Sequence, residues 1–105
     1  MIKLFDNMDI ALKKVPEQKV LKVTINKKEY LLLNYRGCLT LTESHCPHMQ
    51  HPLKECKFNG FNEIICPLHE YRFNIKTGEE SAGRCGPLSV FPVKVNDLGL
   101  FVEIP

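Results

Sequence analysis

The stretch that decides the fold covers residues 45–73 and reads HCPHMQHPLKECKFNGFNEIICPLHEYRF. Near its start Cys46 and His48 stand on either side of one proline, and after seventeen further residues the stretch offers Cys66 and His69. Two thiol and two imidazole side chains therefore come in pairs, with one Cys and one His in each pair. Thiolates favour zinc, copper(I) or iron–sulfur clusters, and imidazole suits zinc and iron. The pattern indicates a metal centre held by these four side chains.

The spacing of the four ligands narrows the kind of centre. Structural zinc sites are usually built from C-x2–4-C and H-x3–5-H turns, whereas each segment here supplies one Cys and one His. The arrangement resembles the Rieske iron–sulfur family, in which two His replace two Cys on one iron of a [2Fe–2S] cluster. Further residues of this chain fall where that family usually has them, namely Pro52-Leu53, Arg72-Phe73, Thr77-Gly78-Glu79 and Gly86-Pro87-Leu88. The alternatives are a zinc site and a coincidental group of core residues.

The resemblance implies a ligand set and a fold. Cys46 and Cys66 would hold one iron of a single [2Fe–2S] cluster, and His48 and His69 the other. The fold would be all-β, with a small antiparallel β-sandwich or barrel as its base and an inserted cluster-binding subdomain of two hairpin loops. The single domain, residues 1–105, would divide into a base of about 1–43 and 78–105 and an insertion of about 44–77. Pro87 and the glycine before it would shield one side of the cluster.

Two residues depart from the pattern of the family. Its first loop usually reads C-P-H-x-G-x-P-L, and here Gln50 stands at the glycine position. Its second loop often has glycine after the histidine, where this chain has Glu70. If these positions adopt positive φ, a side chain there costs about 1 kcal/mol or more. The departures leave the cluster assignment standing, but they point to no particular subfamily.

Two other positions predict a low reduction potential. In high-potential members of the family, a Ser two residues after the second His and a Tyr four residues after it donate hydroxyls to the cluster. Here those positions hold Tyr71 and Phe73, of which Phe73 has no donor and Tyr71 is longer than Ser. Rieske potentials span about −150 to +300 mV, and we expect a value near the bottom of that range. We also expect the potential to fall with rising pH as the histidine protons are lost.

Size and composition are those of an ordinary globular domain. The chain has 105 residues, of which 44% are hydrophobic and 25% charged, and its formal net charge is +2. This length gives room for one domain and a modest core. The small charge and the scattered basic residues argue against nucleic acid or an anionic membrane as a partner. No apolar run approaches the ~18 residues of a membrane span, and the first residues hold no secretion signal, so we expect no membrane anchor.

The remaining cysteines do not suggest a disulfide framework. Besides the two expected ligands the chain has Cys38, Cys56 and Cys85, which is an odd number. Rieske proteins of membrane complexes carry an extra Cys in each cluster loop, and those positions hold His51 and Leu68 here. A reducing cytoplasm is the simplest compartment for such a chain. The three extra cysteines are expected to be small buried or half-buried hydrophobic residues.

Short alternating segments punctuated by Gly and Pro predict the strands. We expect strands over residues 2–5, 18–25, 29–35, 38–42, 63–66, 71–75, 88–95 and 100–104, with one helical turn over 9–12. Asn59-Gly60 between two apolar residues predicts a two-residue hairpin turn. Residues 26–28, 36–37 and 96–99 predict turns, and residues 79–87 a loop. Pro92 predicts an edge position or an irregularity in its strand.

Two more histidines flank the first ligand pair. His45 and His51, together with a carboxylate such as Glu43, could in principle form a mononuclear iron site. However, histidines in a loop beside a cluster are commonly surface residues. Such oxygenases append a large catalytic domain to a Rieske domain, and we expect none in this chain. We therefore expect these side chains to have no metal.

The resemblance implies a one-electron carrier that is not itself an enzyme. It would be a cytoplasmic ferredoxin working between a flavin reductase and a terminal oxygenase. Its docking edge would surround His48 and His69 and would include Met49, Gln50, Leu68 and Pro87. A second hypothesis is the small subunit of a nitrite reductase, with the large subunit as partner. A third is a zinc-stabilised interaction module without a redox role. The sequence leaves the partners, the substrate of the system and the oligomeric state open.

Overall fold

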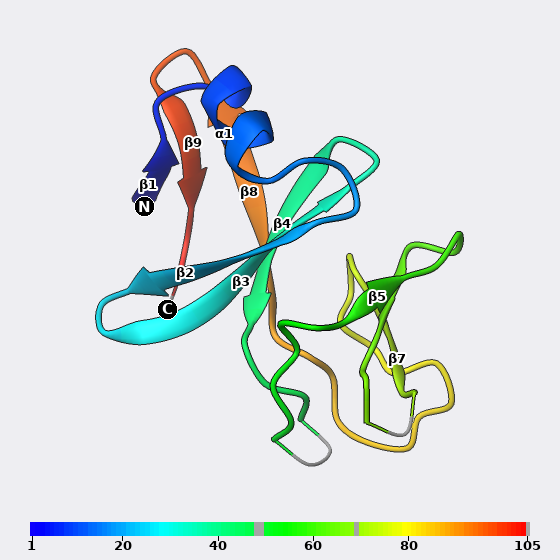
Figure 1. Cartoon of the computed structure of the whole chain (residues 1–105). Coiled ribbons are helices and arrows are strands. Elements are labelled where there is room, and N and C mark those ends of the chain that lie inside the picture. Colours follow the sequence, from blue (N-terminus) through cyan, green and yellow to red (C-terminus); the bar gives the residue numbers. More distant parts are fainter. Residues whose placement is uncertain (48–49, 69, 105) are drawn as a thin grey trace.

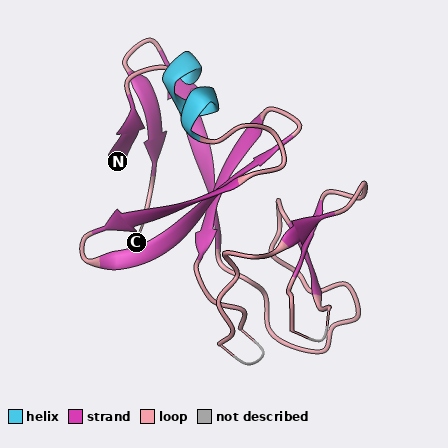
Figure 2. Ribbon diagram, viewed as in Figure 1, coloured by secondary structure: helices cyan, strands magenta, loops and turns pink. Residues whose placement is uncertain are grey.

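A computed structural model describes residues 1–47, 50–68 and 70–104. It contains two antiparallel sheets and a short helix (Figures 1 and 2). In chain order the elements are β1 (Ile2–Phe5), α1 (Met8–Lys14), β2 (Val20–Ile25), β3 (Lys28–Tyr35), β4 (Cys38–Glu43), β5 (Lys57–Phe58), β6 (Glu63–Ile65), β7 (Arg72–Asn74), β8 (Val90–Asn96) and β9 (Gly99–Val102). The larger sheet has the order β1-β9-β8-β4-β3-β2, and the smaller one β5-β6-β7. The predicted all-β class is confirmed.

Strand β3 is buried on both faces and belongs to two cores. Successive side chains of a strand point to opposite faces, so the run from Tyr30 to Tyr35 divides between them. Tyr30 and Leu32 pack into the core of the larger sheet, together with Leu41, Leu100 and Val102. Leu31, Leu33 and Tyr35 pack into the second core, which lies under the smaller sheet and includes Ile64 and Phe73. The second core is the one that contains the candidate metal ligands.

Two tight turns fix the register of β2, β3 and β4. Ile25 pairs with Lys28 and Tyr35 with Cys38, which leaves two residues in each turn. Residues 26, 27, 36 and 37 all have positive φ, as a type I′ turn requires, and such turns match the right-handed twist of the strands. The predicted turn at 36–37 is confirmed, and that at 26–28 uses two residues rather than three.

Pro92 marks the point at which β8 changes its partner. Residues 90–92 of β8 pair with β4, and residues 93–96 pair with β9. Proline donates no ladder hydrogen bond, so it is tolerated where pairing is interrupted. The predicted irregularity is confirmed, although β8 lies in the interior of the strand order.

The helix is longer than the single turn predicted over 9–12. Helix α1 begins after Asn7, whose side-chain oxygen accepts the N–H of Ile10 at 2.9 Å. Such a cap satisfies one of the free N–H groups of the first turn. Ala11 and, just past the helix, Val15 are fully buried in the core of the larger sheet. The cap and this burial extend the helix over seven residues.

The two-residue turn predicted at Asn59-Gly60 is wrong. Lys57 pairs with Ile65 and Phe58 with Ile64, so the connection between β5 and β6 is longer, with residues 59–62 between the two strands. The side-chain oxygen of Asn59 accepts the N–H of Phe61 at 2.9 Å, and the left-handed residue is Asn62, with φ 61°. The asparagine therefore stabilises a wider loop through its side chain.

The smaller sheet is fixed to the larger one at the end of β3. The ring of Tyr35 stacks on Phe58 at a centroid distance of 6.1 Å, and its hydroxyl accepts the N–H of Asn62 at 3.1 Å. These contacts hold β5 and its loop against β3. Within the described ranges, no helix is long and apolar enough to cross a membrane.

Candidate metal centre

Two loops with the same closure contain the predicted cysteine ligands. The first follows β4, and the second lies between β6 and β7; both are at the end of the molecule away from α1 (Figure 1). The N–H of Cys46 donates to the carbonyl of His51 at 2.7 Å, and the N–H of Cys66 donates to that of Tyr71 at 2.8 Å. Each hydrogen bond joins a cysteine to the residue five positions later. The two segments therefore fold back on themselves in the same way.

The residue four positions after each cysteine is left-handed. Gln50 and Glu70 both have a φ of 54°, and both are exposed. This conformation is open to glycine at no steric cost and is rare for other residues. The positions at which the sequence departs from the glycine pattern are thus positions that require positive φ. The matched conformation could not be read from Gln or Glu, because neither residue signals it.

The two cysteines meet in one buried cluster of side chains. Cys46 and Cys66 are both fully buried and belong to the second core. Its other members include the fully buried Leu53, Ile64 and Phe73. The other two predicted ligands, His48 and His69, lie outside the described residues. The structure thus brings the predicted thiol ligands to one apolar site beneath the two loops.

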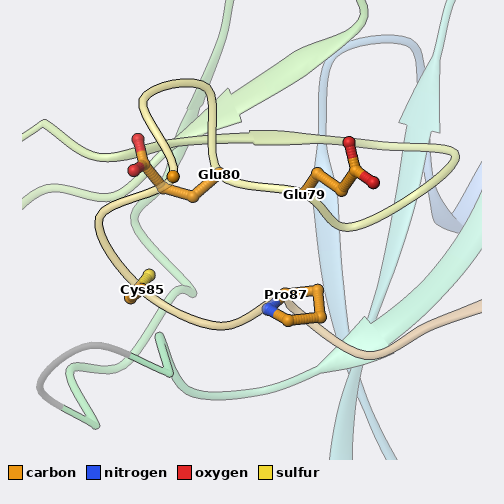
Figure 3. Close-up of a pocket in the computed structure, with 5 residues that line it drawn as sticks. Glu79, Glu80, Cys85 and Pro87 are labelled. Atoms are coloured by element: carbon orange, nitrogen blue, oxygen red, sulfur yellow. The ribbon is translucent and has the colours of Figure 1, made fainter.

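A third loop, residues 81–87, packs beside the cysteines. It begins where Glu80 forms an isolated bridge with Phe73, and Leu88 after it donates to the carbonyl of Gly78 at 2.8 Å. Cys85, near its end, packs against the core that contains Cys46 and Cys66. Cys85 and Pro87 line a cavity of about 260 Å³ with Glu79, Glu80 and Gly83 (Figure 3). The shielding role predicted for Gly86-Pro87 stays a prediction.

Glu80 is the charged residue that sequence reasoning missed. Its side chain is buried in an ion pair with Arg84. Hydrogen bonds from the Arg84 side chain lower the pKa of this carboxyl to about 2, although burial opposes that shift. The Arg84 guanidinium in turn lies 3.8 Å from the ring centroid of Tyr71. The only signal in the sequence was that Glu80 stands four residues before Arg84. That spacing indicates an ion pair on a helix, but in a loop it predicts no contact.

The three extra cysteines divide by environment. Cys56 is buried, and burial raises the pKa of its thiol to about 12. Cys85 is half-buried, and the pKa of its thiol is raised chiefly by burial. For these two the expectation of buried or half-buried residues is confirmed. For Cys38 it is wrong, because this first residue of β4 follows a tight turn and is exposed.

His45 and Glu43 each bond to a different serine. His45 exchanges a hydrogen bond with the hydroxyl of Ser44 at 2.8 Å, and the carboxylate of Glu43 accepts the N–H of Ser89 at 2.9 Å. Among the residues that the structure describes, no group of three or more His, Cys, Asp or Glu side chains is suited to a metal ion. The mononuclear site considered for Glu43, His45 and His51 is not formed there.

The donor chemistry of the site fits an iron–sulfur cluster. Thiolate is the ligand that such clusters take, and Cys46 and Cys66 supply two thiols without leaving the core. The surrounding side chains are apolar and would keep water from the sulfurs, which is one of the ways a protein sets a reduction potential. Two loops with the same closure beside a small antiparallel sheet, with one cysteine in each, define a protein of the Rieske type.

Comparison with known proteins identifies the family. The model of the Rieske [2Fe–2S] domain matches residues 7–92, and the chain belongs to that family. The ferredoxin component of the naphthalene 1,2-dioxygenase system of Pseudomonas putida is 31% identical over 99 residues, which cover 90% of this chain and 91% of the relative.

Solved structures agree on the fold. The Sphingomonas yanoikuyae B1 ferredoxin superposes with a TM-score of 0.77 at 25% identity, covering 98% of this chain and 99% of its own. A putative nitrite reductase NADPH small subunit gives 0.76 at 15% identity, covering 99% of this chain and all (100%) of its own. The predicted Rieske fold is confirmed. Because the two neighbours score alike, the fold does not separate a ferredoxin from a reductase subunit.

Proposed function

We propose that this chain is a Rieske-type ferredoxin that carries one electron at a time between a reductase and a terminal oxygenase. The observation that carries the proposal is the match over nine-tenths of the chain to a dioxygenase ferredoxin component. When bound, the [2Fe–2S] cluster supplies one-electron oxidation and reduction, at about −150 to +300 mV in this family. The chain has no substrate chemistry of its own and is an electron carrier rather than an enzyme.

The ligands in this proposal are Cys46 and Cys66 for one iron and His48 and His69 for the other. The burial of both cysteines in a single core supports the first pair. The closures Cys46–His51 and Cys66–Tyr71 hold the two cysteine backbones in equivalent conformations. Both thiols must lose their protons to bind, so cluster binding would add to the stability of the fold.

We assign the cluster-binding insertion to about residues 44–77 and the base to about 1–43 and 78–105. The separate sheets support this division, since β5, β6 and β7 pair with one another and not with the strands of the larger sheet. The insertion would present the cluster, and the base would support it through the doubly buried strand β3.

The partners proposed are a flavin reductase and a terminal oxygenase, and the compartment is the cytoplasm. The names of the relatives, which are components of dioxygenase systems, support the partners. Besides the two proposed ligands the chain has three cysteines, an odd number, which favours a reducing compartment. The docking edge would surround His48 and His69 and include Met49, Gln50, Leu68 and Pro87, in an interface under about 1,200 Å².

Purification from iron-replete cells under anaerobic conditions tests the proposal. We expect a coloured protein with two iron and two sulfide per chain and a rhombic electron paramagnetic resonance signal after reduction. Cys46→Ser and Cys66→Ser should each abolish the signal, whereas Cys38→Ser, which changes an exposed thiol, should leave it intact. A colourless protein with one zinc per chain would instead establish the interaction module.

A second candidate function is the small subunit of a nitrite reductase. This candidate is supported by the fold of the putative small subunit, which superposes with a TM-score of 0.76 over 99% of this chain. Tagged protein recovered from its own cells separates the two functions. A carrier is recovered alone and accepts electrons from a separate reductase, whereas a subunit is recovered with one large partner in fixed proportion.

A further inference from the structure

We infer that Glu80 and Arg84 are positioning residues, which together hold loop 81–87 closed against the loop that contains Cys66. The inference deepens the proposed function and rests on it in one respect, namely that Cys66 is a cluster ligand. Neither Glu80 nor Arg84 is a predicted ligand. Both lie in the segment that the sequence predicted to be an ordinary loop.

Glu80 is the point at which the hydrogen bonds of this loop converge. Its carboxylate accepts the backbone N–H of Arg84 at 2.7 Å and that of Ala82 at 3.2 Å, and the hydroxyl of Ser81 donates to it at 3.3 Å. The carbonyl of Glu80 also accepts the N–H of Gly83 at 3.0 Å. A single buried side chain thus fixes the backbone through the first half of the loop.

Arg84 completes this arrangement from the other side. Its Nε and Nη2 donate to the two carboxylate oxygens of Glu80 at 3.2 and 2.9 Å. This two-point contact fixes the plane of the guanidinium more firmly than a single bond would. A lysine could keep the charge but not the geometry.

The guanidinium connects the loop to the candidate cluster site. It lies 3.8 Å from the ring centroid of Tyr71, where a cation is attracted to the face of the ring. The carbonyl of Tyr71 is the acceptor that closes the Cys66 loop. The contact between Arg84 and Tyr71 therefore joins the third loop to the backbone closure of the second.

The loop held in this way covers part of the cysteine core. Cys85 follows Arg84 directly and packs against the group that contains Cys46 and Cys66. Without the ion pair between Glu80 and Arg84, we expect loop 81–87 to open more often. Water and small reagents would then reach Cys85 and the sulfurs behind it more often.

Three variants and a matched control test this arrangement in the cluster-loaded protein. Glu80→Gln removes the charge and one acceptor oxygen. Arg84→Lys keeps the charge but loses the two-point hydrogen bond to the carboxylate, and the third variant combines both substitutions. The control is Glu79→Gln, which removes the same charge from the neighbouring exposed side chain. Figure 3 shows Glu79 and Glu80 pointing to different sides of the chain, and in the described part of the structure no hydrogen bond or ion pair of the Glu79 carboxylate is seen.

The first readout is the rate at which iodoacetamide alkylates Cys85, located by mass spectrometry. A charge-assisted hydrogen bond is strong enough to change a local opening equilibrium about tenfold or more. We expect Glu80→Gln and Arg84→Lys each to raise the rate by about that factor, and Glu79→Gln to stay within about twofold of wild type. Because the pair acts as a unit, the double variant should be no faster than the faster single variant. Equal rates in Glu80→Gln and Glu79→Gln, or multiplying effects in the double variant, would overturn the inference.

The second readout is the rate at which a chelator bleaches the visible bands of the cluster. We expect it to rise in the variants that accelerate alkylation and to stay unchanged in Glu79→Gln. Faster alkylation without faster bleaching would overturn the assignment, because the closed loop would then not protect the site. Amide exchange of Leu32 in β3 reports whether each variant is folded. Should Glu80→Gln not fold, Arg84→Lys alone decides.

Failure of the proposed function gives a different pattern. A protein that holds zinc shows no iron–sulfur bands, yet its Cys85 can be alkylated in the same series. The experiments therefore distinguish two failures. In one, the Glu80–Arg84 pair holds loop 81–87 closed but the protein has no iron–sulfur cluster; in the other, the cluster is present but the pair does not protect it.

Discussion

At the scale of single residues, the two cysteine loops each place a side chain where the backbone favours glycine. Gln50 and Glu70 have the same φ of 54° and stand four residues after their cysteines. A residue other than glycine in the left-handed region costs about 1–3 kcal/mol, and part of that cost returns as the lower entropy of its unfolded chain. Both loops therefore hold strain that their closing hydrogen bonds must outweigh.

We predict that glycine at either position stabilises the folded protein. Gln50→Gly and Glu70→Gly should each raise the free energy of unfolding by about 0.5–1 kcal/mol. This gain is the backbone strain that glycine relieves, reduced by the greater conformational entropy that glycine gives the unfolded chain. Denaturant unfolding of the oxidised, cluster-loaded protein measures this. Glu55→Gly is the control: this exposed residue of the same insertion has negative φ, and its replacement should destabilise. Lower stability in both loop variants would show that the left-handed conformations carry no strain.

The residue types predicted that Cys46 and Cys66 belong to one site, but they did not predict the backbone conformation of the two loops. Two Cys–His pairs are a chemical signal, because few other roles need thiols and imidazoles at that spacing. The left-handed conformation of Gln50 had no such signal, since the side chain has no preference for it. Cys38 was wrongly expected to be covered because a cysteine is usually buried, and its exposure depends on the turn before it. The ligand roles of the two cysteines and of the two histidines stay predictions.

At the scale of elements, strand β3 supports both cores. Leu32 faces the core of the larger sheet, and Leu31 faces the core of the cysteines. Both are almost fully buried, with relative exposures of 0% and 1%. Adjacent residues of one strand thus allow the two cores to be perturbed separately with the same chemical change.

We predict that Leu31→Ala and Leu32→Ala differ in their effect on the cluster. Each should lower the free energy of unfolding by about 2–5 kcal/mol, the usual cost of removing a buried leucine. Leu31→Ala should also accelerate loss of the cluster to a chelator well beyond Leu32→Ala, because its cavity opens in the cysteine core. Stopped-flow bleaching, compared at equal stability by adjusting denaturant, separates the two effects. Equal bleaching rates at equal stability would contradict the division into two cores.

The turn at Gly78 leads to a second prediction at this scale. A Cβ built on Gly78 would lie 1.9 Å from the carbonyl oxygen of Leu88, whereas one on Gly83 meets nothing within 4 Å. Both glycines have positive φ, 80° and 66°, so both alanine variants pay the same conformational cost of about 1 kcal/mol. Gly78→Ala should be worse than Gly83→Ala by a further 1–3 kcal/mol, roughly the cost of overpacking.

Thermal unfolding of the two glycine variants under identical conditions measures the difference. Similar melting temperatures would mean that Leu88 moves away freely, and that its hydrogen bond to the Gly78 carbonyl does not fix the end of the third loop.

The elements that were predicted well are those with local causes. The turns at Arg36-Gly37 and Asn96–Gly99 each contain a glycine with positive φ, Gly37 and Gly99, and β2 and β4 follow from alternation. The length of α1 was underestimated because much of its support comes from burying Ala11 against distant strands. The Asn59-Gly60 turn was wrong because the asparagine side chain stabilised a wider loop. In both cases tertiary or side-chain contacts outweighed the local pattern.

At the scale of the whole molecule, the environment of the cysteines predicts the reduction potential. Phe73 is fully buried in the cysteine core and has no group that could donate to a sulfur. Hydrogen bonds to the sulfurs stabilise the more negative, reduced form and so raise the potential. The midpoint should therefore lie near the bottom of the range of about −150 to +300 mV, and a value above roughly +100 mV would contradict this.

Adding a hydroxyl at this position tests the cause. Phe73→Tyr should raise the midpoint by a few tens of mV, since a neutral hydrogen bond contributes about 1 kcal/mol and a tenfold change corresponds to about 59 mV for one electron. Phe58→Tyr is the matched control, because Phe58 stacks on Tyr35 at the edge of the same core and should leave the midpoint unchanged. Protein-film voltammetry measures both variants against wild type. An unchanged midpoint in a folded Phe73→Tyr protein would mean that this side chain does not reach the sulfurs, and that the low potential has another source.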